Sequence, residues 1–419
     1  MNNERAGFIL REIFLNAVGS ARAGPAIPPA LPEKPKGRCV VIGAGKASAA
    51  MAAAVDAAWP DVALSGVVVT RYGHAVPAGR IRIVEAAHPV SDAMSETAAM
   101  LIVEAVKGLS EDDLVLALIS GGGSALMALP APGLTLADKQ VVTRALLHSG
   151  ATIGEMNLVR RHLSAIKGGK LAALAQPARV VSLIISDVPG DRASDIASGP
   201  TVADESTPAE ALSILERYRI PVSRTIYQAL MKPAPPRVRT SPDDVRLIAT
   251  PAMALDAAAL LARQYGLTPM ILGDALEGES RDMGIFMAGM ARSVRQHGQP
   301  LKGPALLLSG GETTVTLTHG KAGRGGRNTE FLLSLACALK GEENVWAIAG
   351  DSDGIDGTED AAGAIVYPDT LTRGRQNGLS HQQSLDAHDS YSYFQALDDL
   401  IVTGPTLTNV NDIRAVLIL

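Results

Sequence analysis

Glycine-rich turns that follow apolar runs are the parts of this sequence best suited to binding an anion. Glycine lets backbone N–H groups approach a ligand closely, and a helix that starts at such a turn adds a partial positive charge. Lys46 stands in one of these turns, and Arg324 and Arg327 stand in another. The turns occupy residues 43–46 (GAGK), 120–124 (SGGGS), 310–314 (GGETT) and 323–328 (GRGGRN). One glycine turn is often structural, but several with cations predict a multiply anionic ligand such as a nucleotide.

Acidic residues at the ends of other apolar runs could complement these cations. The run at residues 180–185 (VVSLII) leads to Asp187, after which Pro189 and Gly190 stop the strand. Asp191 and Asp195 follow in the same loop. The acids of the second half are Glu312, Asp351, Asp353 and Asp356. Carboxylates beside phosphate-binding turns predict Mg²⁺ held partly by substrate phosphates, as in phosphoryl transfer.

Several familiar motifs are excluded by their spacing. A P-loop needs Ser or Thr directly after Lys46, where Ala47 stands, and a dinucleotide fingerprint needs glycine in place of Ser48. The segment DSDGIDG at 351–357 lacks the glutamate that a calcium loop requires. The histidines show no zinc-type spacing, and no Gly-x-Ser-x-Gly elbow occurs. A nicotinamide-dependent reductase, in which Arg71 would receive a 2′-phosphate, remains the alternative.

The elements that position these residues read as alternating strands and helices, which predicts an α/β fold with parallel strands. Apolar runs at 38–42, 64–70, 81–85, 114–119 and 180–185 are the expected strands of a first domain, and residues 136–175 are expected to be mostly helical. A similar pattern recurs from residue 245 onward. The proline-rich segment 231–244 is the predicted linker, so the domains are expected at 1–240 and 241–419.

Composition narrows the class of protein. The 419 residues carry a net charge of −5 with dispersed basic residues, so nucleic acid and anionic membranes are poor candidates for partners. No apolar run approaches the length of a membrane helix, and the amphipathic N-terminus does not resemble a signal peptide. Cys39 and Cys337 stand in apolar runs as free thiols, which favours a cytoplasmic location.

Taken together, motifs in a fixed order resemble the glycerate 2-kinase family with a MOFRL C-terminal domain, some of whose members carry the older label hydroxypyruvate reductase. The resemblance extends from about residue 5 to the end of the chain. The motifs are VIGAGKASAAMA, LISGGGSALM, EMNLVRRHLSAIKGGKLA, ISDVPGDRASDIASGPTVAD, LSGGETTVT, GGRNTEF, AGDSDGIDG and GPTLTNVND. Two positions depart from the family pattern: Thr329 stands in place of glutamine, and Leu407 stands in place of a glycine whose positive φ leucine is expected to avoid.

The resemblance implies a fold and an activity. The fold is two α/β domains around a cleft, the first a Rossmann-like doubly wound sheet. The activity is Mg²⁺-dependent transfer of the γ-phosphoryl group of ATP to the 2-hydroxyl of D-glycerate, and a homodimer is considered as the assembly.

It also implies residue roles. Lys46 would stabilise the transferring group, Asp187 would accept the hydroxyl proton or bind Mg²⁺, and Arg324 or Arg327 would clamp the glycerate carboxylate. The predicted metal ligands are Asp187, Asp191 and Glu312. The predicted nucleotide-binding residues are Gly43, Gly45, Ser120, Gly121, Gly122, Gly123, Ser124, Gly311, Glu312 and Asp351.

Overall fold

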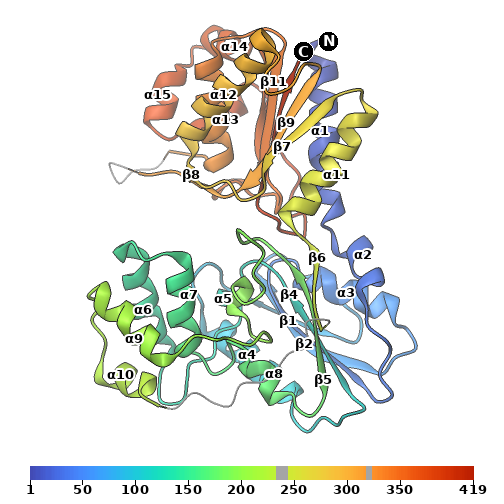
Figure 1. Cartoon of the computed structure of the whole chain (residues 1–419), viewed down its shortest axis with the longest axis vertical. Helices are drawn as coiled ribbons and strands as arrows, with labels where there is room; N and C mark the ends of the chain where they lie inside the picture. Colours follow the sequence, from blue (N-terminus) through green and yellow to red (C-terminus); the bar gives the residue numbers. More distant parts are fainter. Residues whose placement is uncertain (233–243, 318–322) are drawn as a thin grey trace. The chain divides into compact units, whose positions relative to one another are not determined.

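The structure is a computed structural model that describes residues 1–232, 244–317 and 323–419. Most of the predicted linker at 231–244 therefore lies outside the described residues. Contacts divide the chain into two compact units. We call residues Ala23–Ile248 the parallel-sheet unit, and residues Met1–Arg22 together with Ala249–Leu419 the mixed-sheet unit (Figure 1).

The first helix, α1 (Asn3–Ser20), differs from its expected place, because it belongs to the mixed-sheet unit and not to a domain spanning 1–240. Its apolar face buries Ile9, Ile13 and Phe14, and it packs on α11 (Pro251–Gln264) and β11 (Val345–Asp351). Trp346 of β11 donates a hydrogen bond from Nε1 to Asn3 Oδ1 at 2.8 Å. The helix belongs to this unit because segments more than 200 residues away pack on its apolar face. The local sequence pattern gives no information about that packing.

A six-stranded sheet forms the core of the parallel-sheet unit. Its order is β3-β2-β1-β4-β5-β6, the order of doubly wound folds, and the strand order reverses between β1 and β4. The first five strands pair in parallel. Their bounds are β1 (Cys39–Ala44), β2 (Leu64–Arg71), β3 (Arg82–Ala86), β4 (Leu114–Ile119), β5 (Arg179–Ile185) and β6 (Val245–Ala249). Every residue of β1 and β4 is buried, as expected for a parallel sheet covered on both faces.

Helices surround this sheet and form a second apolar core beside it. The second core joins α6, α7, α9 and α10 through buried residues such as Val142, Val159 and Leu215. The segment 136–175 is mostly helical as expected, with breaks at residues 150–152 and 163–169. The helices are α2 (Ala23–Ala26), α3 (Ser48–Ala58), α4 (Ala93–Ala105), α5 (Gly123–Leu126), α6 (Leu136–Ser149), α7 (Ile153–His162), α8 (Lys170–Leu174), α9 (Pro208–Arg217) and α10 (Arg224–Leu230), with 3₁₀ turns η1 (Pro28–Ala30) and η2 (Ile196–Ser198).

The mixed-sheet unit does not repeat the first sheet, although its sequence pattern is similar. Its order is β13-β12-β11-β14-β9-β7, and only β7 and β9 pair in parallel. The C-terminal strand β14 lies in the middle of the sheet, between β11 and β9. The remaining strands are β7 (Thr268–Gly273), β9 (Ala305–Gly311), β12 (Gly363–Val366), β13 (Leu400–Ile401) and β14 (Asp412–Ile418), with the short pair β8 (Gly278–Glu279) and β10 (Thr313–Thr314).

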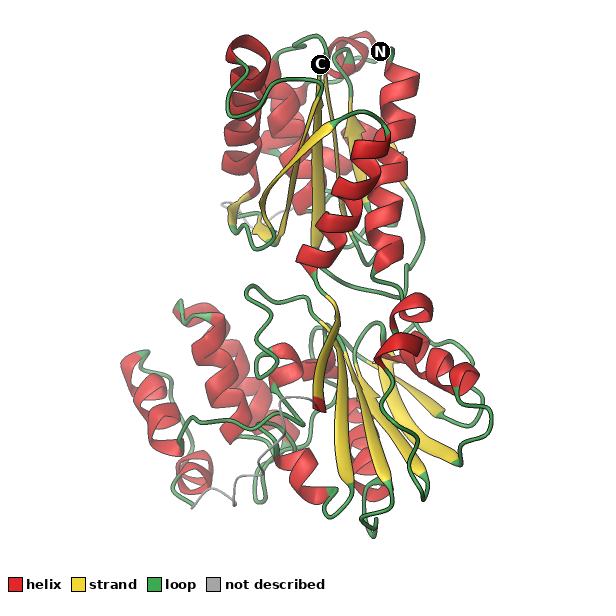
Figure 2. Ribbon diagram, turned by 45° about the vertical axis from the view of Figure 1, so that its right-hand side comes forward, coloured by secondary structure: helices red, strands yellow, loops and turns green. Residues whose placement is uncertain are grey.

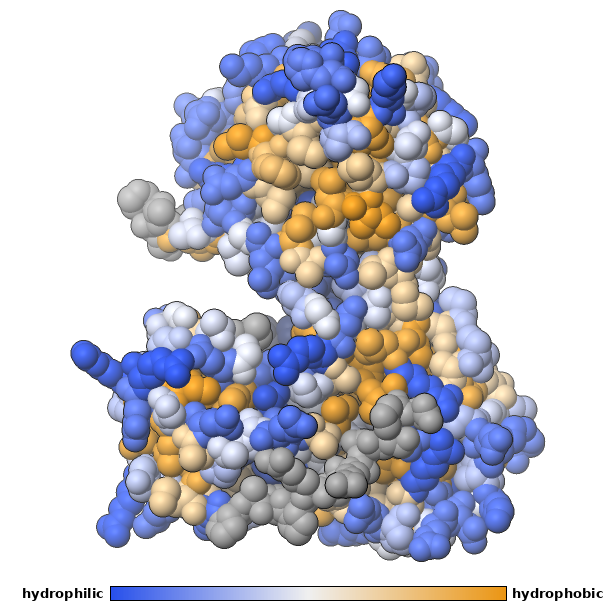
Figure 3. All heavy atoms as spheres, viewed as in Figure 1, coloured by the Kyte–Doolittle hydropathy of each residue, from blue (hydrophilic) through white to orange (hydrophobic). Residues whose placement is uncertain are grey.

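Helices cover both faces of the mixed sheet (Figure 2). Helices α12 (Ser280–His297) and α13 (Arg327–Leu339) pack closely, because Gly284 leaves room for the Phe331 carbonyl, which a Cβ would approach to 2.6 Å. Met253 and Leu260 of α11 and Ile271 of β7 are exposed, and Figure 3 shows hydrophobic surface on the face of this unit where α11 and β7 lie. The small helices are α14 (Thr370–Gln376), α15 (His381–Asp386) and α16 (Ser390–Ala396).

These two units confirm the α/β fold class with a doubly wound first sheet, whereas the cleft stays a prediction. Within the described ranges, no helix combines the length and apolarity needed to cross a membrane.

Candidate active site

Three predicted site residues leave neighbouring strands at one edge of the parallel sheet. The register pairs Ala44 of β1 with Ile119 of β4, and Ile119 with Ile184 of β5. Lys46, Ser120 and Asp187 therefore follow aligned strand ends, and β1 and β5 lie two strand spacings, about 10 Å, apart. This edge includes the point where the strand order reverses, which is where doubly wound sheets bind ligands.

The two glycine turns at this edge are interlocked. Lys46 donates its backbone N–H to the Gly121 carbonyl at 2.9 Å, and Ala47 donates its N–H to Ser120 Oγ at 3.0 Å. A Cβ on Gly45 would approach Ser120 Oγ to 2.0 Å, and one on Gly123 would approach the Ala44 carbonyl to 2.6 Å. These glycines are thus required for the close approach of the two loops. Nucleotide binding by their N–H groups stays a prediction.

Lys167 joins this site, although the sequence offered no signal for it beyond a lysine in a quoted motif. Its side chain is 2% exposed, and Nζ donates to both the carbonyl and Oγ of Ser124 at 2.6 Å. Ser124 Oγ also lies 3.0 Å from Ser198 Oγ. Burial, followed by the charges of Lys139 and Arg160, lowers the pKa of Lys167 well below its usual value.

The carboxylates of the acid-rich loop after β5 are of two kinds: some bind an arginine of the protein, and Asp191 binds none in the described ranges. Asp195 and Asp204 bind the two sides of the Arg161 guanidinium, at 3.0 Å and 3.1 Å. Asp191 instead has a buried oxygen, Oδ1, without a hydrogen-bond partner in the described residues, and its φ is 51°. A carboxylate held in a strained backbone with an oxygen left over is suited to a cation.

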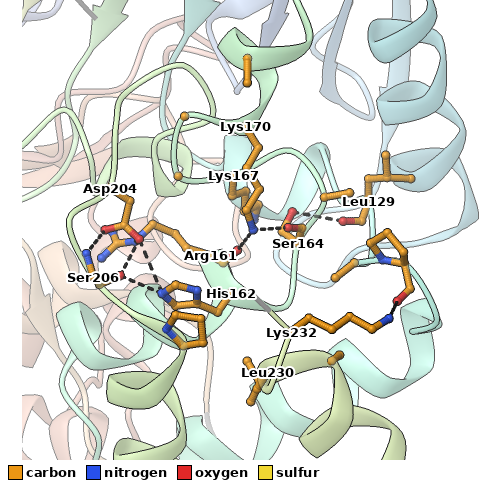
Figure 4. Close-up of a pocket in the computed structure, with 18 of the residues that line it drawn as sticks. Leu129, Arg161, His162, Ser164, Lys167, Lys170, Asp204, Ser206, Leu230 and Lys232 are labelled. Carbon is orange, nitrogen blue, oxygen red and sulfur yellow. Dashed lines mark hydrogen bonds and ion pairs between the residues drawn. The ribbon is translucent and has the colours of Figure 1, made fainter. Parts of the chain in front are cut away.

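A cavity of about 570 Å³ lies behind this loop within the parallel-sheet unit. Figure 4 shows Lys167, Lys170, Arg161 and His162 in its wall, facing apolar residues such as Leu129. Lys170 donates to the carbonyls of Arg161 and Ser164 at 2.8 Å and 2.6 Å. Burial lowers the pKa of His162 to about 4, with a further contribution from Lys170. Most polar groups of this wall are thus bonded to one another.

Arg327, in the mixed-sheet unit, is held by three carboxylates. Its Nε donates to Asp412 Oδ1 at 2.8 Å, Nη1 to Glu312 Oε1 at 2.6 Å, and Nη2 to Asp351 Oδ2 at 2.7 Å. The register explains this arrangement, because Gly311, Asp412 and Asp351 are paired across β9, β14 and β11. Burial alone would lower the pKa of Arg327, but the three carboxylates raise it above its usual value.

The turn that opens α13 already holds an internal anion. Asp356 is buried and accepts hydrogen bonds from the backbone N–H groups of Asn328 and Thr329 at 3.0 Å and 2.9 Å. The Thr329 hydroxyl binds the same carboxylate at 2.8 Å, which gives this departure from the family pattern a role. Burial raises the pKa of Asp356. A protein carboxylate therefore occupies the helix N-terminus that the sequence predicted for phosphate.

Arg324 is more accessible than Arg327, with half of its side chain exposed. It donates from Nε and Nη2 to Glu359 Oε2 at 3.0 Å and 2.7 Å, and its guanidinium lies 4.3 Å from the centre of the Tyr391 ring.

Asp412, the last residue of the C-terminal motif, and Arg414, two residues after it, are fully buried and absent from the sequence prediction. Arg414 Nη2 donates to Asp412 Oδ2 at 2.6 Å, and both side chains are 0% exposed. In the sequence, only their position at the start of the last apolar run could have indicated that these two residues are buried. In the same motif, Leu407 adopts φ 60°, so the expectation that leucine would avoid a positive φ here is wrong.

The predicted metal ligands are divided between the units, with Asp187 and Asp191 in one and Glu312 in the other. Among the described residues, no three His, Cys, Asp or Glu side chains are grouped as a metal site. Two carboxylates with the unpaired oxygen of Asp191 still fit Mg²⁺, which is commonly held by one or two carboxylates and substrate phosphates.

Family models match the two parts of the chain separately. Residues 9–231 match a domain of unknown function, DUF4147, and residues 305–412 match the MOFRL family. The chain is 41% identical over 404 residues to a D-glycerate 2-kinase from Thermotoga maritima, with 96% of each chain covered. The chain belongs to the glycerate kinase family. This membership confirms the resemblance drawn from the ordered motifs.

Other members of the glycerate kinase family support the same assignment. The chain is 34% identical to the human glycerate kinase, with 96% of this chain and 91% of the human protein covered. A crystal structure of a glycerate kinase from Thermotoga maritima matches with a TM-score of 0.90 and 39% identity, over 99% of this chain and 100% of that one. An Agrobacterium vitis protein named "Putative hydroxypyruvate reductase" is 62% identical over 418 residues, with 100% and 95% of the two chains covered.

Proposed function

We propose that this protein transfers the γ-phosphoryl group of ATP to the 2-hydroxyl of D-glycerate, giving 2-phosphoglycerate and ADP. Membership of the glycerate kinase family supports phosphorylation of glycerate, and the Thermotoga relative's name supports the 2-position. The observation that carries the proposal is the emergence of Lys46 and Asp187 from aligned strand ends. Phosphoryl transfer depends mainly on positioning and charge stabilisation, which a cation and a carboxylate at one edge can supply.

In this proposal Lys46 stabilises the charge of the transferring group, and Asp187 accepts the hydroxyl proton or binds Mg²⁺. Mg²⁺, when bound, neutralises charge on the phosphate oxygens, and Asp187 and Asp191 would hold it. Backbone N–H groups of the turn at 120–124 bind the nucleotide phosphates, whereas the N–H groups of Gly45 and Lys46 donate to the Val69 and Gly121 carbonyls and hold the neighbouring turn in place. Arg324 clamps the glycerate carboxylate, because half of its side chain is exposed and one carboxylate, Glu359, binds it, whereas Arg327 is less exposed and is bound by three.

The test mixes the protein with D-glycerate, ATP and Mg²⁺ and follows the release of ADP. The product is then offered to enolase, which consumes 2-phosphoglycerate directly and does not consume 3-phosphoglycerate. Reactions without glycerate measure background ATP hydrolysis. If ADP release depends on glycerate but enolase does not consume the product, the protein is a glycerate kinase that does not phosphorylate the 2-hydroxyl.

A hydroxypyruvate reductase is the second candidate, because the 62% identical relative carries that name. Arg71 at the end of β2 is the residue that would receive the 2′-phosphate of NADPH. Oxidation of NADH or NADPH with hydroxypyruvate, together with no ADP release from ATP and glycerate, would favour this function over the kinase.

A cytoplasmic location and a homodimer belong to the same proposal. Cys39 and Cys337 are free thiols, and burial raises the pKa of Cys39 to about 12, which suits an inert thiol in a reducing compartment. Light scattering of the purified protein tests the homodimer.

A further inference from the structure

Two buried and two partly buried cations of the parallel-sheet unit have no carboxylate within ion-pair distance in the described residues. Lys139 of α6 is 7% exposed and Lys167 is 2% exposed. Arg160 of α7 and Lys170 of α8 are partly buried. None of these residues was predicted to take part in the site, and the proposed mechanism uses none of them.

Lys167 and Lys170 donate hydrogen bonds to neutral oxygen atoms, and Lys139 has no hydrogen-bond partner among the described residues. Lys167 binds Ser124, and Lys170 binds two backbone carbonyls. The Nζ of Lys139 is buried without a hydrogen-bond partner in the part of the chain that the structure describes. Arg161, the neighbour of Arg160, shows the opposite arrangement, since Asp195 and Asp204 bind its guanidinium.

Lys167 contacts the glycine turn at 120–124 directly through Ser124, and a chain of hydrogen bonds links the residue after Lys139 to the same segment. Gln140, next to Lys139, donates to the Ser91 carbonyl at 2.8 Å, and Ser91 Oγ donates to the Ala125 carbonyl at 2.7 Å. Ala125 follows Ser124, the residue that Lys167 binds. Figure 4 shows Lys170 in the cavity wall, where its amine donates to the Ser164 carbonyl.

Burial of several cations without counter-charge is unfavourable unless a partner neutralises them. Burial, followed by the charges of Lys170 and Arg160, lowers the pKa of Lys139 to about 8. Glu96 of α4 is the acid that acts on Lys139 in the opposite direction, and Asp204 does so on Lys170. An anionic ligand would supply the charge that the described protein groups do not.

We propose that Lys139, Arg160 and Lys167 form an oxyanion-binding site beside the turn at 120–124. The oxyanion is either the carboxylate of the small acid substrate or a phosphoryl group of the nucleotide. This inference deepens the proposed function and rests on it for the identity of the ligand, but binding of the anion itself is measured without catalysis.

The experiment measures equilibrium binding by calorimetry for D-glycerate, inorganic phosphate and ADP, each alone. We expect Lys139→Met to weaken the affected ligand about 10- to 100-fold, as for the loss of a charged contact. Arg144→Met is the matched control, because Arg144 is an exposed cation on the same helix, and its binding constants should equal those of the wild type.

The ligand arms distinguish the two sources of the oxyanion. Weaker glycerate binding assigns the site to the substrate carboxylate, and weaker phosphate and ADP binding assigns it to the nucleotide. Unchanged binding of all three in Lys139→Met overturns the inference. If the wild-type protein releases no ADP from ATP and glycerate, the proposed function fails, while the phosphate arm still tests the oxyanion site.

Two further measurements separate binding from a structural role. Removal of an unneutralised buried charge should raise the unfolding temperature of ligand-free Lys139→Met and abolish its stabilisation by the anion. Glu96→Gln should tighten anion binding several-fold, because it removes the opposing charge. A lower unfolding temperature with unchanged anion stabilisation would show that Lys139 is structural, and the inference would be wrong.

Discussion

In the parallel-sheet unit, the lysines near the turn at 120–124 bind neutral oxygens, whereas in the mixed-sheet unit every nitrogen of Arg327 binds a carboxylate. Both sites follow glycine turns at strand ends, and both look alike in the sequence. The difference lies in the source of counter-charge. In the mixed-sheet unit, carboxylates of the protein neutralise Arg327 and fix its position. In the parallel-sheet unit, we expect a bound anion to neutralise the buried cations.

The largest expected effect comes from Asp412→Asn, which removes a carboxylate that neutralises Arg327 and Arg414 in the mixed-sheet unit. This change leaves Arg414, which is 0% exposed, without its carboxylate and weakens the hold on Arg327. We expect the free energy of unfolding to fall by about 3–5 kcal/mol, as when one partner of a buried ion pair is removed. Denaturant unfolding checks this, with Asp61→Asn, at an exposed pair with Lys34, as the control. Equal stability of both variants would contradict the prediction.

In the parallel-sheet unit, Lys46→Ala should lower kcat by about 10²- to 10³-fold, comparable with losing one preorganised charge contact in a transition state. The free energy of unfolding should change little, in contrast to Asp412→Asn. Steady-state ADP release at saturating substrates measures kcat, and circular dichroism checks the fold. Lys34→Ala, at an exposed lysine of the same unit, is the control. Turnover like that of the wild type in Lys46→Ala would remove its proposed role.

The cationic surroundings of the cavity also predict a pH dependence of stability. The pKa of His162 is lowered to about 4 from 6.5, because burial and Lys170 disfavour the imidazolium. Its contribution is complete above about pH 6.5 and is lost as the pH falls toward 4, at roughly 3 kcal/mol in total. His162→Gln should flatten this part of the stability profile. His148→Gln, at an exposed histidine, should keep the wild-type profile. Identical profiles of the two variants would contradict the assignment.

The smallest expected effect concerns the loop of the mixed-sheet unit that leads into Asp412. Leu407 holds φ 60°, which is unfavourable for a residue with a Cβ. Leu407→Gly should therefore raise the free energy of unfolding by about 0.5–1 kcal/mol. Val402→Gly, at an exposed position without a positive φ, should lower it by a similar amount. Destabilisation by both changes would show that the loop is not strained at Leu407.

Much of the parallel-sheet unit could be predicted from the sequence, because each strand is a short apolar run that ends at a turn. Lys46, Ser120 and Asp187 could thus be assigned to strand ends, and the parallel register brings those ends to one edge. Lys139, Arg160 and Lys167 could not be found in this way. Among the described residues, their signal is burial without a carboxylate partner, which is a property of the packed helices and not of their local sequence.

The order of elements, the family and the residues that follow each strand can be read from the amino-acid sequence, because they depend on local periodicity and ordered motifs. Which charges neutralise one another depends on how the chain packs. Asp412 reaches Arg327 because the C-terminal strand inserts between β9 and β11, and Asp356 occupies the start of α13 because a distant loop folds onto it. These pairings join segments tens of residues apart, so local patterns contain no trace of them.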